Sequence, residues 1–119
     1  MEPSPPKKRY DLEDRTAAFA DSVRKFAKRI PLTPLNTEDL KQVVRSSGSV
    51  AANYVEANDS LGKGDFRMRI RICRKESKES KLWLQLLSVS PDLEPIRLSL
   101  VQESHELMCI FGSILTKCS

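Results

Sequence analysis

The sequence predicts an all-α protein, an antiparallel up-down-up-down four-helix bundle, and three observations support this fold class. Apolar residues recur at steps of three and four in four separate stretches, the spacing that places them on one face of a helix. Short stretches rich in proline, glycine, asparagine or serine separate these four stretches. The 119 residues include only 4 glycines and few clusters of β-branched residues, which leaves little material for a sheet.

The length fits one domain with a core of its own, preceded by a short arm. Residues 1–9 contain three prolines and three basic residues and are predicted to form a flexible basic arm. Residues 10–118 are predicted to form the bundle, with helices at about 11–30, 37–57, 65–88 and 91–117. Short connections between helices of this length favour antiparallel neighbours.

The first predicted helix has the most regular apolar pattern in the chain. Its seam consists of Leu12, Thr16, Phe19, Val23, Phe26 and Ile30. Asp11 is placed to cap its N-terminus, and Pro31 and Pro34 are predicted to end it.

The second predicted helix begins after Pro34, with Asn36 or Thr37 as its N-cap. Its seam consists of Leu40, Val43, Ser47, Val50 and Tyr54. The middle of the helix, from Ser46 to Ser49, has small residues of low helix propensity. Small residues inside a periodic helix indicate close approach of a neighbouring backbone.

The third predicted helix has three different faces. Its apolar seam consists of Phe66, Ile70, Cys73, Ser77, Ser80, Leu84 and Leu87. A second face, which we call the basic ridge, consists of Arg67, Arg71, Arg74, Lys75, Lys78 and Lys81. A third line places two carboxylates between apolar ends and consists of Ile72, Glu76, Glu79 and Trp83.

The fourth predicted helix begins with Ser90 as a cap and Pro91 at the first helical position. Its seam consists of Leu93, Ile96, Leu100, Ser104, Leu107, Ile110 or Phe111, and Ile114. Further apolar residues flank the seam at Leu98 and Met108, among others. A stripe this wide implies a second partner, either within the bundle or across a subunit interface.

The positive charge is concentrated on the third helix. The chain has a net charge of +4, while the stretch from Lys63 to Lys81 has 8 basic residues against 3 acidic ones. A localised basic field is typical of proteins that bind polyanions, with nucleic acid the usual partner. The ordinary alternative is a solvated helix face.

Other features point to a cytoplasmic, soluble chain. Cys73, Cys109 and Cys118 lack CxxC spacing, and no signal-peptide pattern opens the sequence, so reduced thiols are expected. No apolar run approaches the roughly 18 residues that a membrane span needs.

Antiparallel geometry places residues equidistant from a turn side by side. Around the second turn, Arg45 is level with Glu76 and Glu79, so these three residues are predicted to form a structural ion pair. Around the third turn, Glu76 is level with Glu103, and Glu76-x-x-Glu79 with Glu103-x-x-Glu106 offers a candidate Mg²⁺ site. This spacing is loosely similar to that of the all-α nucleotide pyrophosphohydrolases.

Ion pairs are the preferred interpretation of these carboxylates. Arg45, Lys75 and Lys78 supply enough positive charge to neutralise the first pair without a metal. No catalytic residue, metal or cofactor is therefore expected, and the chain is not predicted to be an enzyme.

Two blocks of sequence resemble one known family. The run Gln42 to Ala57, QVVRSSGSVAANYVEA, is similar to the "RSSxSVxANxxEA" helix of the four-helix-bundle proteins also called the S23 ribosomal or 23S rRNA intervening-sequence family. The run RKESKES from Arg74, followed by Trp83 and Leu84, resembles that family's "RKExxESxxWL" helix. The matching positions are Arg45, Ser49, Asn53, Glu56, Lys75, Glu76, Glu79 and Trp83.

The resemblance implies an up-down-up-down bundle that assembles into a homopentamer with a positively charged surface. Some relatives are similar to accessory proteins of diversity-generating retroelements, which bind nucleic acid and a reverse transcriptase. We therefore expect a non-enzymatic, oligomeric bundle whose basic ridge binds nucleic acid, structured RNA rather than a particular DNA sequence. The alternative is that the ridge bridges subunits, using the acidic residues Glu13, Asp14 and Asp21, in a scaffold for a protein partner.

Overall fold

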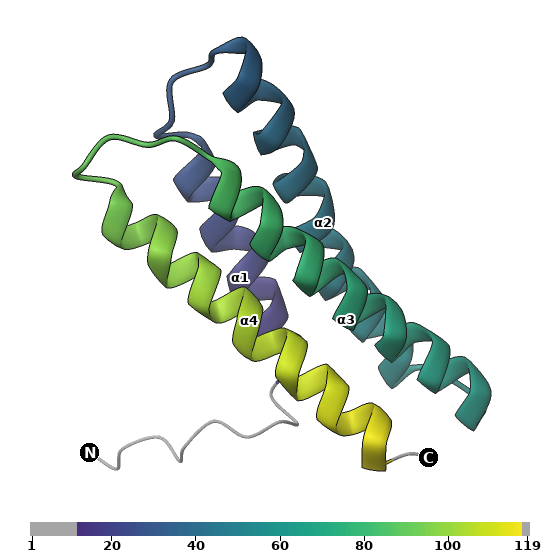
Figure 1. The fold of residues 1–119 in the computed structure, drawn as a ribbon. Helices are drawn as coiled ribbons and strands as arrows, with labels where there is room; N and C mark the ends of the chain where they lie inside the picture. The colour runs from purple at the N-terminus through teal and green to yellow at the C-terminus, as the bar shows by residue number, and fades with distance from the viewer. Residues whose placement is uncertain (1–11, 118–119) are drawn as a thin grey trace, which may run out of the picture.

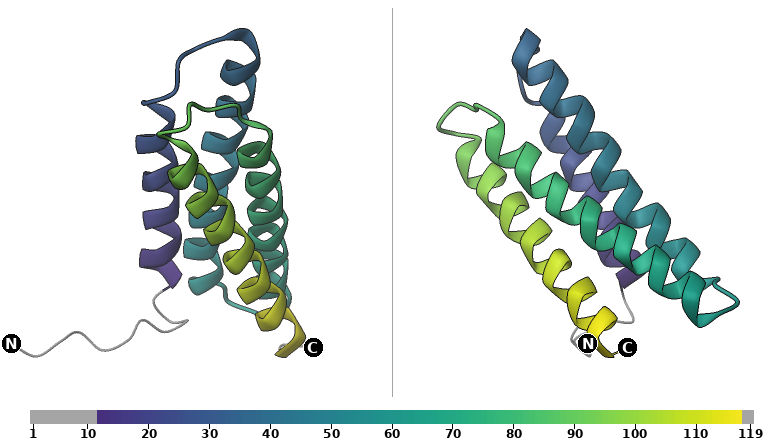
Figure 2. Two further views of the ribbon diagram at one scale, coloured as in Figure 1. Left: turned by 60° about the vertical axis from the view of Figure 1, so that its left-hand side comes forward. Right: turned by 45° about the vertical axis from the view of Figure 1, so that its right-hand side comes forward.

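A computed structural model describes residues 12–117, and this part of the chain folds into four α-helices without a strand. They are α1 (Leu12–Ala27), α2 (Pro34–Asn58), α3 (Lys63–Leu86) and α4 (Glu94–Lys117). Consecutive helices run antiparallel and pack against one another, and α1 closes the bundle by packing on α4 (Figures 1 and 2). The predicted all-α four-helix bundle is therefore confirmed. The arm predicted at residues 1–9 lies outside the described residues.

The core is built from the predicted seams. In α1 and the turn after it, every seam residue from Leu12 to Ile30 is buried, as is every seam residue of α2. In α4, Phe111 rather than Ile110 lies in the core, where its ring packs 6.0 Å from that of Tyr54. Burying these apolar side chains is the main stabilising contribution to the fold.

The end of α1 and the beginning of α2 both lie three residues before the predicted positions. The helix α1 ends at Ala27, and the Arg29 and Ile30 amides form tighter three-residue turns to Phe26 and Ala27. The prediction that α2 starts near residue 37 was wrong, because Thr33 is the N-cap and Pro34 is at the first helical position. Proline fits there since the first amides of a helix have no intrahelical partner, and the Thr33 hydroxyl accepts from the Asn36 amide at 3.2 Å.

The bounds of α3 differ from the prediction by two residues at each end, and the start of α4 differs by three. The helix α3 runs from Lys63 to Leu86 after Gly62. The predicted start of α4 at Pro91 was wrong, because residues 91–93 form a hydrogen-bonded turn and the helix begins at Glu94. The Ser90 hydroxyl donates to the Asp92 side chain at 2.5 Å instead of capping an amide.

Small residues let α2 and α3 form the largest helix–helix contact. The hydroxyl oxygens of Ser46 and Ser80 lie 2.7 Å apart in the core, and Ser77 is also fully buried. At Gly48, however, the prediction of a neighbouring backbone was wrong. A Cβ there would lie 3.1 Å from a guanidinium nitrogen of Arg24, which is the end of a side chain of α1.

None of the helices within residues 12–117 combines the length and apolar character that a membrane span would need.

Candidate nucleic-acid interface

The basic ridge divides into two rows on α3. Arg67, Arg74 and Lys81 are seven residues apart, so they lie along the edge of α3 that faces α4. Arg67 donates to the Leu115 carbonyl oxygen at 3.0 Å, and the Arg74 side chain lies over Gly112. The Lys81 ammonium is 3.1 Å from the His105 ring nitrogen Nδ1. These three residues therefore fix the position of the ridge beside α4.

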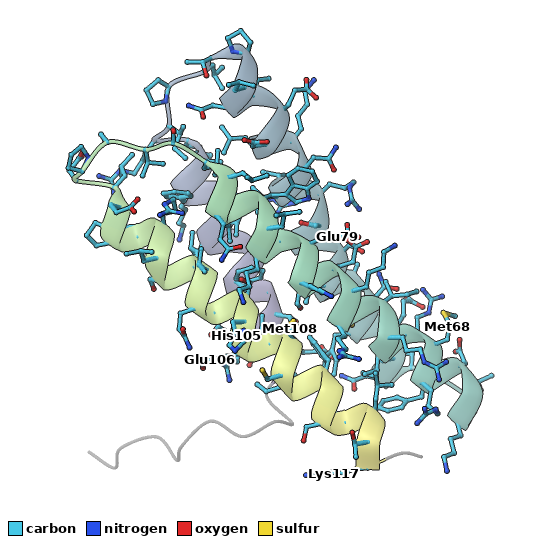
Figure 3. All side chains as sticks on the ribbon, viewed as in Figure 1. Met68, Glu79, His105, Glu106, Met108 and Lys117 are labelled. Atoms are coloured by element: carbon cyan, nitrogen blue, oxygen red, sulfur yellow. The ribbon has the colours of Figure 1, made fainter. Side chains whose placement is uncertain are left out.

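The other row faces outward. Arg71, Lys75 and Lys78 are exposed. Lys75, Lys78 and Lys81 also line an open groove with Leu82, Gln85, Glu79 and Met108, which lies between the outer face of α3 and α4. Met108 and His105 lie close together on α4, whereas Met68 lies toward the other end of α3 (Figure 3).

No residue of the basic ridge forms an ion pair with a carboxylate within residues 12–117. Basic residues on the other three helices do so: Arg15 with Glu103, Arg45 with Glu76, and Arg97 with Glu94. The six cations of the ridge thus have no carboxylate partner among the described residues, and the same holds for Arg24, Lys28 and Arg29 at the end of α1 and in the turn after it.

The structure brings together Arg45, Glu76 and Glu79 across α2 and α3. The Arg45 guanidinium lies 3.3 Å from Glu76 and 3.5 Å from Glu79, and the Ser49 hydroxyl donates to Glu76 at 3.4 Å. Glu76 is only 6% exposed. A carboxylate buried to this extent requires such donors, and the group acts as a structural contact between the two helices.

The two Glu-x-x-Glu pairs face different neighbours. Glu103 and Glu106 both contact Arg15 of α1, at 2.8 and 3.0 Å. Glu76 and Glu79 instead contact α2, and Figure 3 shows Glu79 and Glu106 on opposite sides of the α3–α4 pair. Within residues 12–117 no group of three or more histidine, cysteine or acidic side chains could hold a metal ion. The geometry therefore gives no support to the Mg²⁺ site.

Hydrogen bonds donated by Arg15 also shift pKa values at the α1–α4 contact. The bond to Glu103 is the main cause of the raised pKa of Arg15. Hydrogen bonds from Gln102 and then Arg15 lower the pKa of Glu106. Both shifts favour the charged forms, so this contact is held by an ionised pair at neutral pH.

The acidic residues of α1 that the subunit-bridging alternative uses either contact another residue of the same chain or are exposed to solvent. Glu13 accepts from the Asn58 side chain at 2.6 Å, and Asp21 pairs with Lys25 at 2.9 Å on the same helix. Asp14 is exposed.

One basic residue of α3, Arg69, was not singled out from the sequence. It points toward α2, donates to the Asn53 side chain at 3.0 Å and has a buried Nε without a partner among the described residues. The buried indole Nε1 of Trp83, on the same side of α3, is likewise without one. The spacing of Arg69 from Ile72 and Glu76 was the signal that could have placed it on the α2 side.

Comparisons with known proteins yield a structural relative. No family model and no curated protein matches the sequence. Three solved chains match, among them the crystal structure of a protein with unknown function from Bacteroides thetaiotaomicron, described as a member of the S23 ribosomal protein family. It superposes with a TM-score of 0.73 at 25% identity, covering 87% of this chain and 97% of that chain. The fold match confirms the resemblance to the S23 ribosomal protein family that the two sequence blocks predict.

Proposed function

We propose that this bundle is a non-enzymatic protein that binds nucleic acid through the basic ridge of α3. The observation that carries the proposal is the set of six cationic side chains without a carboxylate partner among the described residues. Of the described arginines outside the ridge, Arg15, Arg45 and Arg97 contact carboxylates, whereas Arg24, Arg29 and Arg69 do not. An uncompensated row of charge costs stability through mutual repulsion, and a polyanion relieves that repulsion.

The ridge has the dimensions of a phosphate-backbone contact. From Arg67 to Lys81 it extends over 14 helical rises, or about 21 Å. Each phosphate neutralised by lysine or arginine releases condensed counterions, which gives affinity without base recognition. Contacts of this kind position a ligand and do not specify its sequence.

The partner proposed is RNA rather than DNA. This preference rests on the sequence resemblance to the family also called the 23S rRNA intervening-sequence family; the solved relative is described as a protein of unknown function. The family resemblance also implies a homopentamer, and a ring would repeat the ridge around its axis. A structured RNA could then contact several ridges at once, so that its total affinity exceeds that for a single ridge.

The test is binding of RNA and DNA by the purified protein, with its mass in solution measured in the same buffers. Arg71→Glu with Lys78→Glu is expected to remove salt-sensitive binding while the mass stays constant. Lys25→Glu with Lys41→Glu makes the same change in net charge on α1 and α2 and is expected to retain binding. Absence of binding by the intact oligomer at low salt would contradict the proposal.

A second function, scaffolding of a protein partner, is favoured by apolar residues on the same face. Met68, Leu82 and Leu86 are 41%, 46% and 56% exposed among the basic residues of α3. Apolar side chains add little to phosphate binding but much to a protein interface. Leu82→Ser with Leu86→Ser leaves RNA affinity unchanged under the first proposal and dissociates the oligomer or its protein complex under the second.

The absence of enzymatic activity is part of the proposal. It is supported by the division of the four glutamates between Arg15 and Arg45. Mg²⁺-dependent nucleotide turnover that Glu76→Ala and Glu103→Ala each abolish would overturn this part of the proposal.

A further inference from the structure

A lysine of the basic ridge, a histidine and a cysteine form a line across α3 and α4, and the proposed function does not use the histidine or the cysteine. The Lys81 ammonium lies 3.1 Å from Nδ1 of His105, and the other ring nitrogen, Nε2, lies 3.6 Å from the Cys109 sulfur. Cys109 is exposed. His105 and Cys109 are four residues apart on α4, so the helix itself holds them side by side.

The lysine determines which ring nitrogen of His105 carries the proton. An ammonium group can only donate, so Nδ1 must accept from Lys81. In the neutral ring the proton then resides on Nε2, which points at the Cys109 sulfur. A thiolate accepts that hydrogen bond better than a thiol, and the Lys81 charge acts in the same direction. The arrangement therefore places a hydrogen-bond donor beside the Cys109 sulfur, with a cation behind that donor.

The α3 side of Cys109 is cationic, and the carboxylate three residues before it on α4, Glu106, is paired with Arg15. Lys75, Lys78 and Lys81 line the groove that includes Met108, the residue before Cys109. The Arg74 guanidinium lies over Gly112, less than one turn further along α4. A small reagent with negative charge is therefore attracted to this site, whereas a cationic one is repelled.

We propose that Cys109 is a reactive thiol that undergoes exchange with small anionic disulfides. The Cys109 thiolate attacks one sulfur of the disulfide, and the new bond joins Cys109 to that half of the molecule. The original sulfur–sulfur bond breaks, and the other half leaves as a thiolate that takes a proton from water. His105 donates the hydrogen bond to the attacking sulfur, and Lys81 is a positioning residue that acts through His105. The inference does not depend on nucleic-acid binding.

The first test measures alkylation of Cys109 by neutral iodoacetamide in the full chain with Cys118→Ser. Cys73 is an internal reference, because burial raises its pKa to about 12 and keeps it unreactive in the folded protein. His105→Gln and Lys81→Met are each expected to slow alkylation by about threefold, because the attacking sulfur loses the hydrogen-bond donor or the cation that positions that donor. Lys81→Arg retains a cationic donor and is expected to keep the wild-type alkylation rate. Lys63→Met removes a distant charge of α3 and is expected to leave the alkylation rate unchanged.

A second measurement separates positioning from a structural effect. The chain has a single histidine, so the ring nitrogen resonances of His105 are unambiguous. The ¹⁵N spectrum is expected to show the Nε2–H form, and Lys81→Met is expected to shift the tautomer mixture. Rates with 5,5′-dithiobis(2-nitrobenzoate) and cystamine, each relative to a free cysteine thiol, are expected to favour the anionic reagent. Equal alkylation rates in all variants, or equal relative rates for both disulfides, would overturn the proposal.

Discussion

At the scale of single residues, the most informative group is the buried carboxylate of Glu76. Its neighbours are Arg45, which is half exposed, and Ser49. Burial removes water from the carboxylate, and the two donors replace it. The stabilising role of Arg45 is therefore to prevent an unpaired buried charge rather than to add a strong attraction.

Replacing Arg45 tests this role. Arg45→Met is expected to lower the free energy of unfolding by about 2 kcal/mol, because Glu76 then has only Ser49 as a donor. Adding Glu76→Gln is expected to recover most of the loss, since the buried charge is gone. Urea denaturation at pH 7 measures both changes. The control is Lys41→Met, whose exposed ammonium lies 3.8 Å from Glu38 and whose loss should cost less than about 0.5 kcal/mol. A cost for Arg45→Met as small as that of the control would contradict the assignment.

Cys73 makes stability depend on alkaline pH. Its thiol is buried, its sulfur lies 3.5 Å from the Val50 carbonyl oxygen, and burial raises its pKa to about 12. Since this pKa is raised above that of the unfolded chain, the unfolded state loses its proton first as pH rises. The contribution of Cys73 is therefore complete below about pH 8.5 and declines as pH rises toward 12.

The measurement is the difference in unfolding free energy between the wild type and Cys73→Ala, in reducing buffer, from pH 7 to pH 10.5. The difference is expected to fall as pH rises above about 8.5. Subtraction removes the titration of the lysines, and a Tyr54→Phe background removes that of Tyr54, whose pKa is raised by burial, by Glu13 and by Cys73 itself. A difference that stays constant over the whole range would show that Cys73 is not desolvated in the native state.

At the scale of elements, α2 contains neighbouring small residues with different roles. The Ser46 hydroxyl meets that of Ser80 across the buried α2–α3 contact. Gly48 faces the Arg24 side chain, which belongs to an exposed residue that can move away. Small size is thus required at Ser46 and is dispensable at Gly48.

Two substitutions on α2 are therefore expected to change stability in opposite directions. Gly48→Ala should raise the free energy of unfolding by about 0.5–1 kcal/mol, because alanine is the better helix former and Arg24 can shift. Ser46→Val should lower it by about 1–3 kcal/mol, since it overpacks the contact and leaves the Ser80 hydroxyl unpaired. Urea denaturation of each variant checks the sign. Destabilisation by Gly48→Ala would mean that Arg24 is fixed in place.

The elements also show how far sequence reasoning extends. The heptad seams predicted which face of each helix is buried, because burial of apolar side chains decides orientation. Helix boundaries were harder to predict from the sequence. Pro34 is compatible with the end of one helix or the start of the next, and the hydrogen bond between the Thr33 hydroxyl and the Asn36 amide shows that it starts α2. Arg69 was missed because it lies within a stretch rich in basic residues, where an arginine is expected to face solvent. Its hydrogen bond to Asn53 is visible only in the structure.

At the scale of the whole molecule, charge is distributed unevenly among the helices. Arg15, Arg45 and Arg97 contact carboxylates and help to hold the bundle together. The basic ridge makes no ion pair within residues 12–117 and lies on one side of the bundle, along α3 and its border with α4. Arg15, Arg45 and Arg97 thus serve the structure, whereas Arg71, Lys75 and Lys78 of the outward row form no ion pair within the described residues and carry the proposed binding.

The measurement that tests this division most directly is the salt dependence of RNA affinity. Arg71→Gln with Lys78→Gln is expected to reduce the steepness of log K against log salt by about 1.5, since each lost phosphate contact contributes about 0.7–0.9. Lys25→Gln with Lys41→Gln removes the same charge from residues that already pair with Asp21 and Glu38, and is expected to leave the slope unchanged. Equal slopes for both double variants would contradict the assignment of the basic ridge as the binding surface.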